Sequence, residues 1–180
     1  KLQGHPNMND TPGVDMTTGS LGQGLSAACG MALAGRLDKK GYRAYAVLGD
    51  GECEEGQIWE AAMSAAQYKL DNLTAILDHN GLQIDGRNDE VMNIEPIEDK
   101  WKAFGWYTIR IDGHDMQQII DALDRAKETK ERPNLIIANT VKGKGVSYME
   151  NQVGWHGTAP DKEQRDKAIE ELTQRGEGIE

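Results

Sequence analysis

Cysteine is scarce in this sequence: its 180 residues include only Cys29 and Cys53, which form no CxxC pair. This excludes a disulfide framework of the kind that staples small secreted domains, and it fits the reducing environment of the cytoplasm. Long hydrophobic runs are also missing and no signal-peptide pattern opens the chain, so we expect no membrane association and a cytoplasmic location. Positive charge is in deficit, with 20 Lys and Arg against 30 Asp and Glu and a formal net charge of −10, which argues against nucleic acid as a partner.

Repeats, low-complexity tracts and internal domain boundaries are missing as well, and the length suits one domain. The chain starts at Lys1 rather than at Met. We therefore expect residues 1–180 to form a single domain that is incomplete at its N-terminus. The tail after Arg175 is expected to fray.

Apolar, β-prone stretches alternate with helix-like segments along the chain. We expect strands at residues 42–48, 73–78, 106–111 and 135–141, helices at residues 21–37, 55–69, 96–104, 116–128 and 162–174, and a loop at residues 81–93. This alternation predicts an α/β fold, with a parallel β-sheet and helices on both faces.

Asp50 and Asn80 are the most informative residues, because each follows directly or closely on an apolar strand-like stretch, at residues 45–48 and 73–77. Thirty positions and one helix-like segment separate them, which is the length of a βαβ unit with parallel strands. Parallel strands end at one edge of a sheet, where ligands of α/β proteins bind, so the two side chains can reach a common point. A carboxylate, an amide oxygen and nearby backbone carbonyls are hard ligands that suit Mg²⁺ held together with a phosphate.

The same residues could also have purely structural roles that need no ligand. Asp50 could cap the helix that follows it, and Asn80 with Gly81 could form a plain turn. A nucleotide-binding Rossmann domain is a weak alternative, because residues 22–24 (GQG) open a helix and lack the third glycine of the GxGxxG pattern. Gly51 would let the backbone approach a phosphate closely, because it has no Cβ.

Several blocks of the sequence, taken in order, resemble the transketolase family, and specifically its thiamine diphosphate-binding domain. They are residues 17–24 (TTGSLGQG), 49–56 (GDGECEEG), 78–86 (DHNGLQIDG) and 140–145 (TVKGKG), followed by His156-Gly157. In that family, GDG followed some thirty residues later by Asn marks the site of thiamine diphosphate and Mg²⁺. Blocks in one order over nearly the whole chain are far more specific than a single Gly-rich match.

The resemblance implies a thiamine diphosphate-binding fold that holds thiamine diphosphate and Mg²⁺. It implies that the metal ligands are Asp50, Asn80 and the backbone carbonyl of Leu82. The implied cofactor-binding residues are Gly19, Leu21, Asp50, Gly51, Glu55, Asn80, Ile84 and His156. The implied catalytic residues are His156 and His5, because imidazole titrates near neutral pH and can move protons at a substrate hydroxyl or carbonyl. Judged without the family pattern, Ile84 could be a core residue and each histidine a solvated loop side chain.

The sequence departs from the family pattern at Ser20, where the family usually has Pro. Serine is a favourable helix N-cap, so we expect the turn to survive with more freedom. Lys144 is expected to order the rim of the diphosphate site, and His114 to open a helix with a structural role.

The activity implied by the resemblance is transfer of a two-carbon ketol unit from a ketose phosphate to an aldose phosphate. No block resembles the pyrimidine-binding domain that completes the site in this family, so the chain alone should provide half a site and be inactive. We expect its partner to be a C-terminal pyrimidine-domain subunit, in a dimer or heterotetramer, and we expect an exposed apolar face around Leu21, Ile84 and Met92. A truncated transketolase, another thiamine enzyme such as deoxyxylulose-5-phosphate synthase, and a non-catalytic thiamine diphosphate-binding lobe remain as alternatives. The sugar pair is not determined by the sequence.

Overall fold

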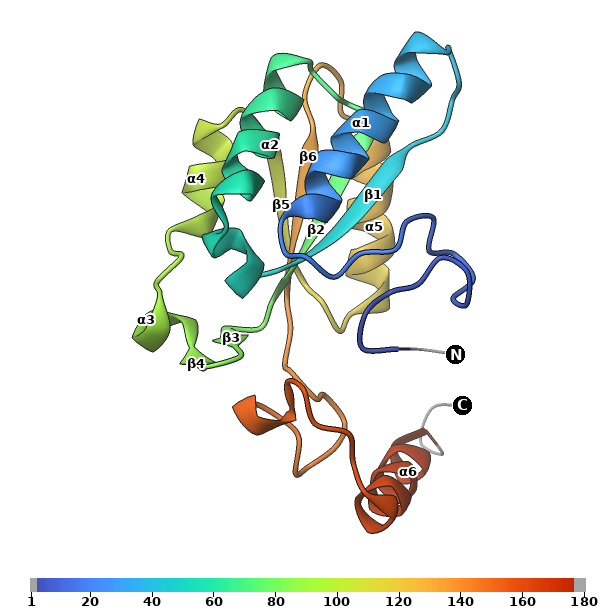
Figure 1. Cartoon of the computed structure of the whole chain (residues 1–180), viewed down its shortest axis with the longest axis vertical. Coiled ribbons are helices and arrows are strands. Elements are labelled where there is room, and N and C mark those ends of the chain that lie inside the picture. The colour runs from blue at the N-terminus through green and yellow to red at the C-terminus, as the bar shows by residue number, and fades with distance from the viewer. Residues whose placement is uncertain (1–2, 177–180) are drawn as a thin grey trace.

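A parallel sheet of four strands, in the order β1-β2-β6-β5, forms the centre of the computed structural model (Figure 1). The strands are β1 (Ala44–Gly49), β2 (Leu73–His79), β5 (Tyr107–Asp112) and β6 (Asn134–Asn139). A short antiparallel hairpin, β3 (Leu82–Gln83) and β4 (Gly86–Arg87), follows β2. The structure describes residues 3–176, so most of the tail after Arg175 lies outside the described residues.

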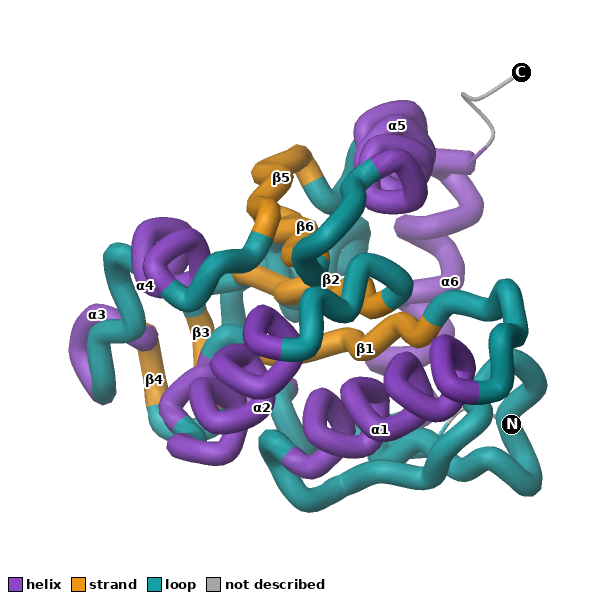
Figure 2. Tube along the Cα trace, turned by 90° about the horizontal axis from the view of Figure 1, so that it is seen from above, coloured by secondary structure: helices purple, strands orange, loops and turns teal. Residues whose placement is uncertain are grey.

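Helices cover both faces of this sheet, as the sequence predicted. The helices of the described residues are α1 (Gln23–Leu37), η1 (Gly51–Glu54), α2 (Gly56–Gln67), α3 (Asn88–Val91), α4 (Ile97–Ala103), α5 (Met116–Glu128), η2 (Val153–Trp155) and α6 (Lys162–Gly176). Figure 2 shows α1, α2 and α4 on one side of the sheet and α5 on the other. No helix in the part of the chain that the structure describes has the length and apolar character needed to cross a bilayer.

The larger core lies between the sheet and α1, α2 and α4. Small residues of α1 and α2, such as Ala32 and Ala62, are fully buried and bring both helices close to the strands. On the α4 side the core is aromatic: the Trp101 ring lies 4.7 Å from Trp106 and 5.4 Å from Trp59, measured between centroids. A buried aromatic cluster of this size contributes several kcal/mol and holds α4 firmly beside the site.

The opposite core is smaller because a single helix covers it. Ile119, Ala122 and Leu123 of α5 pack on β5 and β6. Asp115 caps the first turn of α5 by accepting from the backbone N–H groups of Gln117 and Gln118, a contact typically worth about 1 kcal/mol. Val47 on β1 remains 73% exposed on this side, so α5 does not extend over the edge strand.

The register of the strands brings their carboxyl ends to one level. Gly49 of β1 pairs with Asp78 of β2, which pairs with Ala138 of β6. The segments that follow these strands therefore leave the sheet at the same edge. The last of them, residues 140–161, extends away from the sheet below that edge and ends in α6 (Figure 1).

Polar contacts hold this C-terminal segment in place. The His114 ring accepts a hydrogen bond from the Val141 N–H at 2.8 Å, so His114 has a structural contact, although Asp115 and not His114 caps α5. Glu171 of α6 accepts from the Ser147 backbone at 2.6 Å and from its hydroxyl at 2.7 Å. Both anchors are polar because no residue of α6 in the described range is buried.

The α/β fold, the parallel sheet and the five main helices were predicted correctly, but some local expectations were wrong. The helix expected at residues 55–69 is α2, and a separate short helix, η1, precedes it, because Glu55 between them is extended at φ −70°, ψ 127°. The loop expected at residues 81–93 contains β3, β4 and α3. Ser20 is not the N-cap of α1: Gly22 holds that position at φ 84°, and no side chain of its own caps the helix.

Candidate functional site

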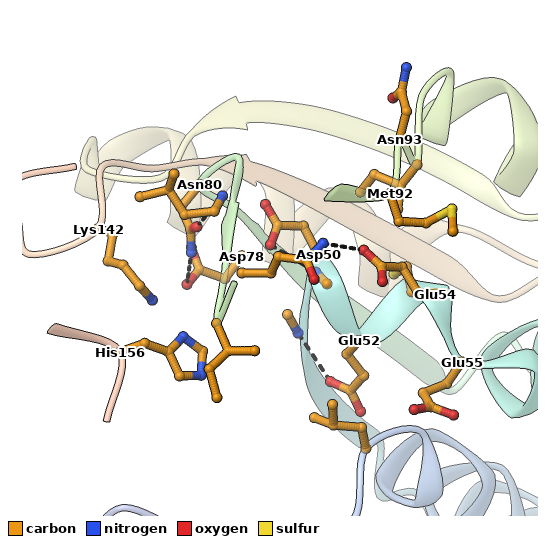
Figure 3. Close-up of a pocket in the computed structure, with 18 of the residues that line it drawn as sticks. Asp50, Glu52, Glu54, Glu55, Asp78, Asn80, Met92, Asn93, Lys142 and His156 are labelled. Carbon is orange, nitrogen blue, oxygen red and sulfur yellow. Dashed lines mark hydrogen bonds between the residues drawn. The ribbon is translucent and has the colours of Figure 1, made fainter. Parts of the chain in front are cut away.

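A cavity of about 940 Å³ opens at the carboxyl ends of β1 and β2 (Figure 3). Its lining comes from five separate stretches of the chain: Leu21; residues 49–55 with Trp59; Asp78, Asn80 and residues 82–84; residues 92–94 with Lys100 and Phe104; and Lys142 with His156. The position agrees with the general rule for ligand sites in α/β sheets. The volume suits a cofactor-sized molecule.

Asp50 lies at the floor of this cavity and is 1% exposed. Its carboxylate accepts from the Gly51 N–H at 2.9 Å and from the Gly81 N–H at 2.6 Å, so it joins the turn after β1 to the turn after β2. Burial raises the pKa of Asp50, and the two backbone hydrogen bonds oppose that shift only in part. A buried carboxylate with this balance is a favourable partner for a cation, which would relieve the cost of the charge.

Asn80 is oriented by its neighbours. Its Oδ1 accepts from the Leu82 N–H at 2.9 Å, and its Nδ2 donates to Asp78 at 3.2 Å. Asp78 also accepts from the Thr140 hydroxyl, which ties this turn to the end of β6. These contacts fix the orientation of the Asn80 amide, and its oxygen keeps a second lone pair for a ligand.

The backbone at Gly51 packs so closely against Gln83 that no side chain fits there. A Cβ on Gly51 would lie 2.9 Å from the Cβ of Gln83, inside van der Waals contact. The Gln83 amide also donates to Glu54, so the β3 strand is held against η1. The missing side chain at Gly51 therefore lets β3 pack closely against this turn.

The rim of the cavity is apolar and exposed, as the sequence predicted. Leu21 is 56% exposed, Met92 58% and Ile84 65%. Ile84 is therefore not a core residue. Glu55 lines the same opening and stands at the N-terminus of α2, where it makes no capping hydrogen bond.

His156 and Lys142 enter the site from the C-terminal segment. Figure 3 shows both side chains on the side of Asp78 and Asn80, and Glu54, Met92 and Asn93 on the other side of Asp50. Lys144, expected at the rim of the diphosphate site, does not line the cavity and approaches Glu150 at 4.0 Å, whereas Lys142 lines it. The glycines on either side of Lys144 turn the backbone at φ 72° and 98°, which reverses the direction of the segment.

His5 and Gly19 do not line the cavity. They lie against one another: a Cβ built on Gly19 would be 3.3 Å from Cδ2 of the His5 ring. The structure thus brings together Leu21, Asp50, Gly51, Glu55, Asn80, Leu82, Ile84 and His156 of the predicted site, and leaves His5 and Gly19 outside the lining.

Several residues that line the cavity were not predicted from the sequence. Glu52 accepts from the N–H groups of Gly22 and Gly49, and Asp78 orients Asn80. Glu52 and Glu54 both lie between Gly51 and Glu55 in the same motif. Their positions in the sequence alone gave no reason to single out Glu52. Cys53 is buried below the turn, and burial raises its pKa to about 12, so it is a packing residue without thiolate reactivity.

The donor set around Asp50 fits a hard divalent cation. Among residues 3–176 no three His, Cys, Asp or Glu side chains cluster as a metal site. Asp50, Asn80 and a backbone carbonyl would instead supply three oxygens, which leaves further positions for phosphate oxygens and water, the usual arrangement for Mg²⁺. The turn at Gly51 lies next to this carboxylate, which accepts from the Gly51 N–H.

Comparison with known proteins agrees with this geometry. Residues 1–175 match the family described as transketolase, thiamine diphosphate binding domain. The chain is 48% identical over 179 residues to one of the subunits of apulose-4-phosphate transketolase from Phocaeicola vulgatus, covering 99% of this chain and 63% of that protein. It is 48% identical over 175 residues to the 6-deoxy-6-sulfo-D-fructose transketolase subunit SqwG of a Clostridium species, covering 97% of this chain and 64% of that protein.

Solved structures show the same fold. The transketolase of Campylobacter jejuni superposes with a TM-score of 0.84 at 34% identity, covering 89% of this chain and 26% of that one. The chain thus spans a little under two thirds of these two transketolase subunits and about a quarter of the Campylobacter transketolase. Family model, relatives and fold agree, and the chain belongs to the transketolase family, in which it corresponds to the thiamine diphosphate-binding domain.

Proposed function

We propose that this chain is the diphosphate-binding half of a two-part transketolase, which transfers a two-carbon ketol unit from a ketose phosphate to an aldose phosphate. The observation that carries the proposal is that Asp50 and Asn80 line one cavity, next to the tightly packed turn at Gly51. The names of the relatives, which describe them as transketolase subunits, support the two-part form.

In this proposal Asp50, Asn80 and the Leu82 carbonyl hold Mg²⁺. Gly51 would bind the diphosphate once its N–H is released from Asp50, to which it donates at 2.9 Å. Leu21 and Ile84 would form apolar walls for the rings of the cofactor. Thiamine diphosphate, when bound, supplies the electron sink for breaking and forming the carbon–carbon bond. The protein supplies orientation and exclusion of water.

His156 is the proposed proton carrier nearest the cavity, and Lys142 beside it adds positive charge that suits a phosphate. His5 and Gly19 are proposed to complete the wall at the substrate side as a pair in mutual contact. Glu55 is proposed to steady the first turn of α2, where a carboxylate suits the helix dipole.

The proposed partner is a pyrimidine-binding subunit. The exposed apolar rim formed by Leu21, Ile84 and Met92 would be covered by it, which would exclude water from the reacting atoms. A dimer or heterotetramer is the proposed assembly. The free, buried thiols of Cys29 and Cys53 are compatible with a reducing cytoplasm, the location that we propose.

The test is reconstitution. The chain should be inactive alone and active when mixed with the proposed pyrimidine-domain subunit, in a coupled assay with thiamine diphosphate and Mg²⁺. The donor panel should contain xylulose 5-phosphate and the sugars for which the relatives are named, apulose 4-phosphate and 6-deoxy-6-sulfofructose, with several aldose phosphates as acceptors. Activity of the pure chain alone would contradict the two-part proposal, and cofactor binding without turnover on any sugar would favour a non-catalytic lobe.

A further inference from the structure

We propose that Glu52 is a positioning residue, whose carboxylate ties the loop ending at Gly22 to the turn that carries Asp50 and so fixes Leu21 at the cavity rim. The proposal deepens the proposed function and rests on it, because the two tied loops are those assigned to different parts of the cofactor. Glu52 itself is given no contact with the cofactor or the substrate.

The Glu52 carboxylate accepts two hydrogen bonds, one at each oxygen, from Gly22 and Gly49, and we call this pair of bonds the Glu52 fork. Oε1 accepts from the Gly22 N–H at 2.7 Å, and Oε2 accepts from the Gly49 N–H at 3.1 Å. Gly22 is 30 positions away in the sequence, so the first of these bonds crosses from the end of β1 to the beginning of α1. In Figure 3 Glu52 lies between the Asp50 turn and the ribbon of α1. Hydrogen bonds to a charged, half-buried acceptor are stronger than those between neutral groups.

Glu52 also caps the N-terminus of α1, which no side chain of the helix itself does. Gly22 is the N-cap and has a left-handed conformation, φ 84°, and α1 has neither a side-chain cap nor an acidic residue in its first turn. The first N–H groups of a helix lack partners within it and carry a partial positive charge. The Glu52 carboxylate accepts from one of these groups, the Gly22 N–H, and places a carboxylate at the N-terminus of the helix from a different segment.

The rest of the contact between α1 and α2 does not depend on Glu52. The Gln57 side chain accepts from the Gln23 amide at 2.6 Å and donates to the Ser26 hydroxyl at 3.0 Å. Leu25 and Ile58 are fully buried between the helices. Loss of the Glu52 fork should therefore make the loop that ends at Gly22 more mobile and leave α1 and α2 packed together. An effect on the position of this loop can then be distinguished from a general loss of stability.

The first test is amide hydrogen exchange on the full chain without cofactor. Glu52→Gln removes the charge and replaces one carboxylate oxygen by an NH₂ group that cannot accept, so at most one neutral hydrogen bond to a glycine remains. Exchange in residues 19–24 should therefore quicken about tenfold while β2 and β6 stay unchanged. Gln57→Ala is the matched control, because it removes the hydrogen bonds between the helices and leaves the fork. Unchanged exchange in residues 19–24 of Glu52→Gln, or equal loss of protection in β2 and β6, would overturn the proposal.

The second test uses the complex with the partner subunit. Glu52→Gln should raise the apparent Kd for thiamine diphosphate about tenfold, and excess cofactor should restore most of the turnover. Glu52→Asp keeps the charge with a shorter reach, so its Kd should lie between those of the wild type and Glu52→Gln. Loss of kcat with an unchanged cofactor Kd would overturn the positioning role. Failure of the wild-type complex to bind the cofactor would instead refute the proposed function, and the exchange result would still judge the fork.

Discussion

Asp50 and Gly81, 31 positions apart, are joined by a 2.6 Å hydrogen bond from the Gly81 N–H to the Asp50 carboxylate. The same carboxylate accepts from Gly51, so one buried side chain sets the distance between the turns after β1 and β2. The residue proposed as the charged metal ligand is thus also what holds the two sides of the metal site together.

Replacing Asp50 by Ala should weaken Mg²⁺-dependent binding of thiamine diphosphate by at least about 2 kcal/mol, the scale for losing a buried charged interaction. Calorimetry on the complex with its partner measures this. Asp124→Ala on the distant, exposed part of α5 is the charge-matched control and should bind as the wild type does. Equal affinity with and without Mg²⁺ in the wild type, or no loss in Asp50→Ala, would contradict the assignment.

Replacing His156 by Ala should lower turnover of the reconstituted enzyme about 10²–10⁴-fold, the usual loss when a general acid–base is removed, and change cofactor affinity much less. Steady-state rates and a cofactor titration on the same preparation separate the two effects. Lys162→Ala, in the same C-terminal segment and exposed, serves as the control. A rate loss below threefold would show that His156 is peripheral to the chemistry.

Replacing Gly51 by Ala should lower the free energy of unfolding by about 1–3 kcal/mol, because the new methyl group would meet the Gln83 Cβ at 2.9 Å and force the hairpin away from η1. Gly56→Ala is a close control, since a Cβ at Gly56 meets nothing within 4 Å and alanine favours a helix. Urea unfolding of both variants gives the comparison. Equal stability of the two would mean that the turn has room to adjust.

Glu98 should make stability depend on pH. Its carboxylate accepts from Lys102 at 2.8 Å and from Arg110 at 3.1 Å, and these bonds lower its pKa to about 2. A lowered folded-state pKa stabilises the fold above the ordinary carboxyl pKa and loses that effect as pH falls toward 2. Glu98→Gln should therefore cost about 1 kcal/mol at pH 7, since the pair is partly exposed, and almost nothing at pH 2. Urea midpoints across this range measure the difference, with Asp99→Asn as control; a difference that does not shrink in acid would contradict the assignment.

The sequence predicted much of the fold because the apolar stretches of β1, β2 and β6 and the apolar face of α5 are local patterns. Asp50 and Asn80 could be placed together because parallel strands end at one edge. The contacts of Glu52 and Asp78 could not be predicted, since each depends on a partner more than 25 residues away, Gly22 and Thr140 respectively. The choice of Lys142 over Lys144 depends on the backbone reversal at Gly143 and Gly145, which leaves no periodic signal in the sequence.

The measurement that tests the central claim most directly is the anomalous scattering of Mn²⁺, substituted for Mg²⁺, in crystals of the complex with thiamine diphosphate. The account predicts one peak within coordination distance of an Asp50 carboxylate oxygen, the Asn80 Oδ1 and the Leu82 carbonyl, with the remaining ligands from the diphosphate and water. A peak bound by Glu52, Glu54 and Glu55 instead, or a diphosphate bound away from Gly51 with no metal at Asp50, would contradict it.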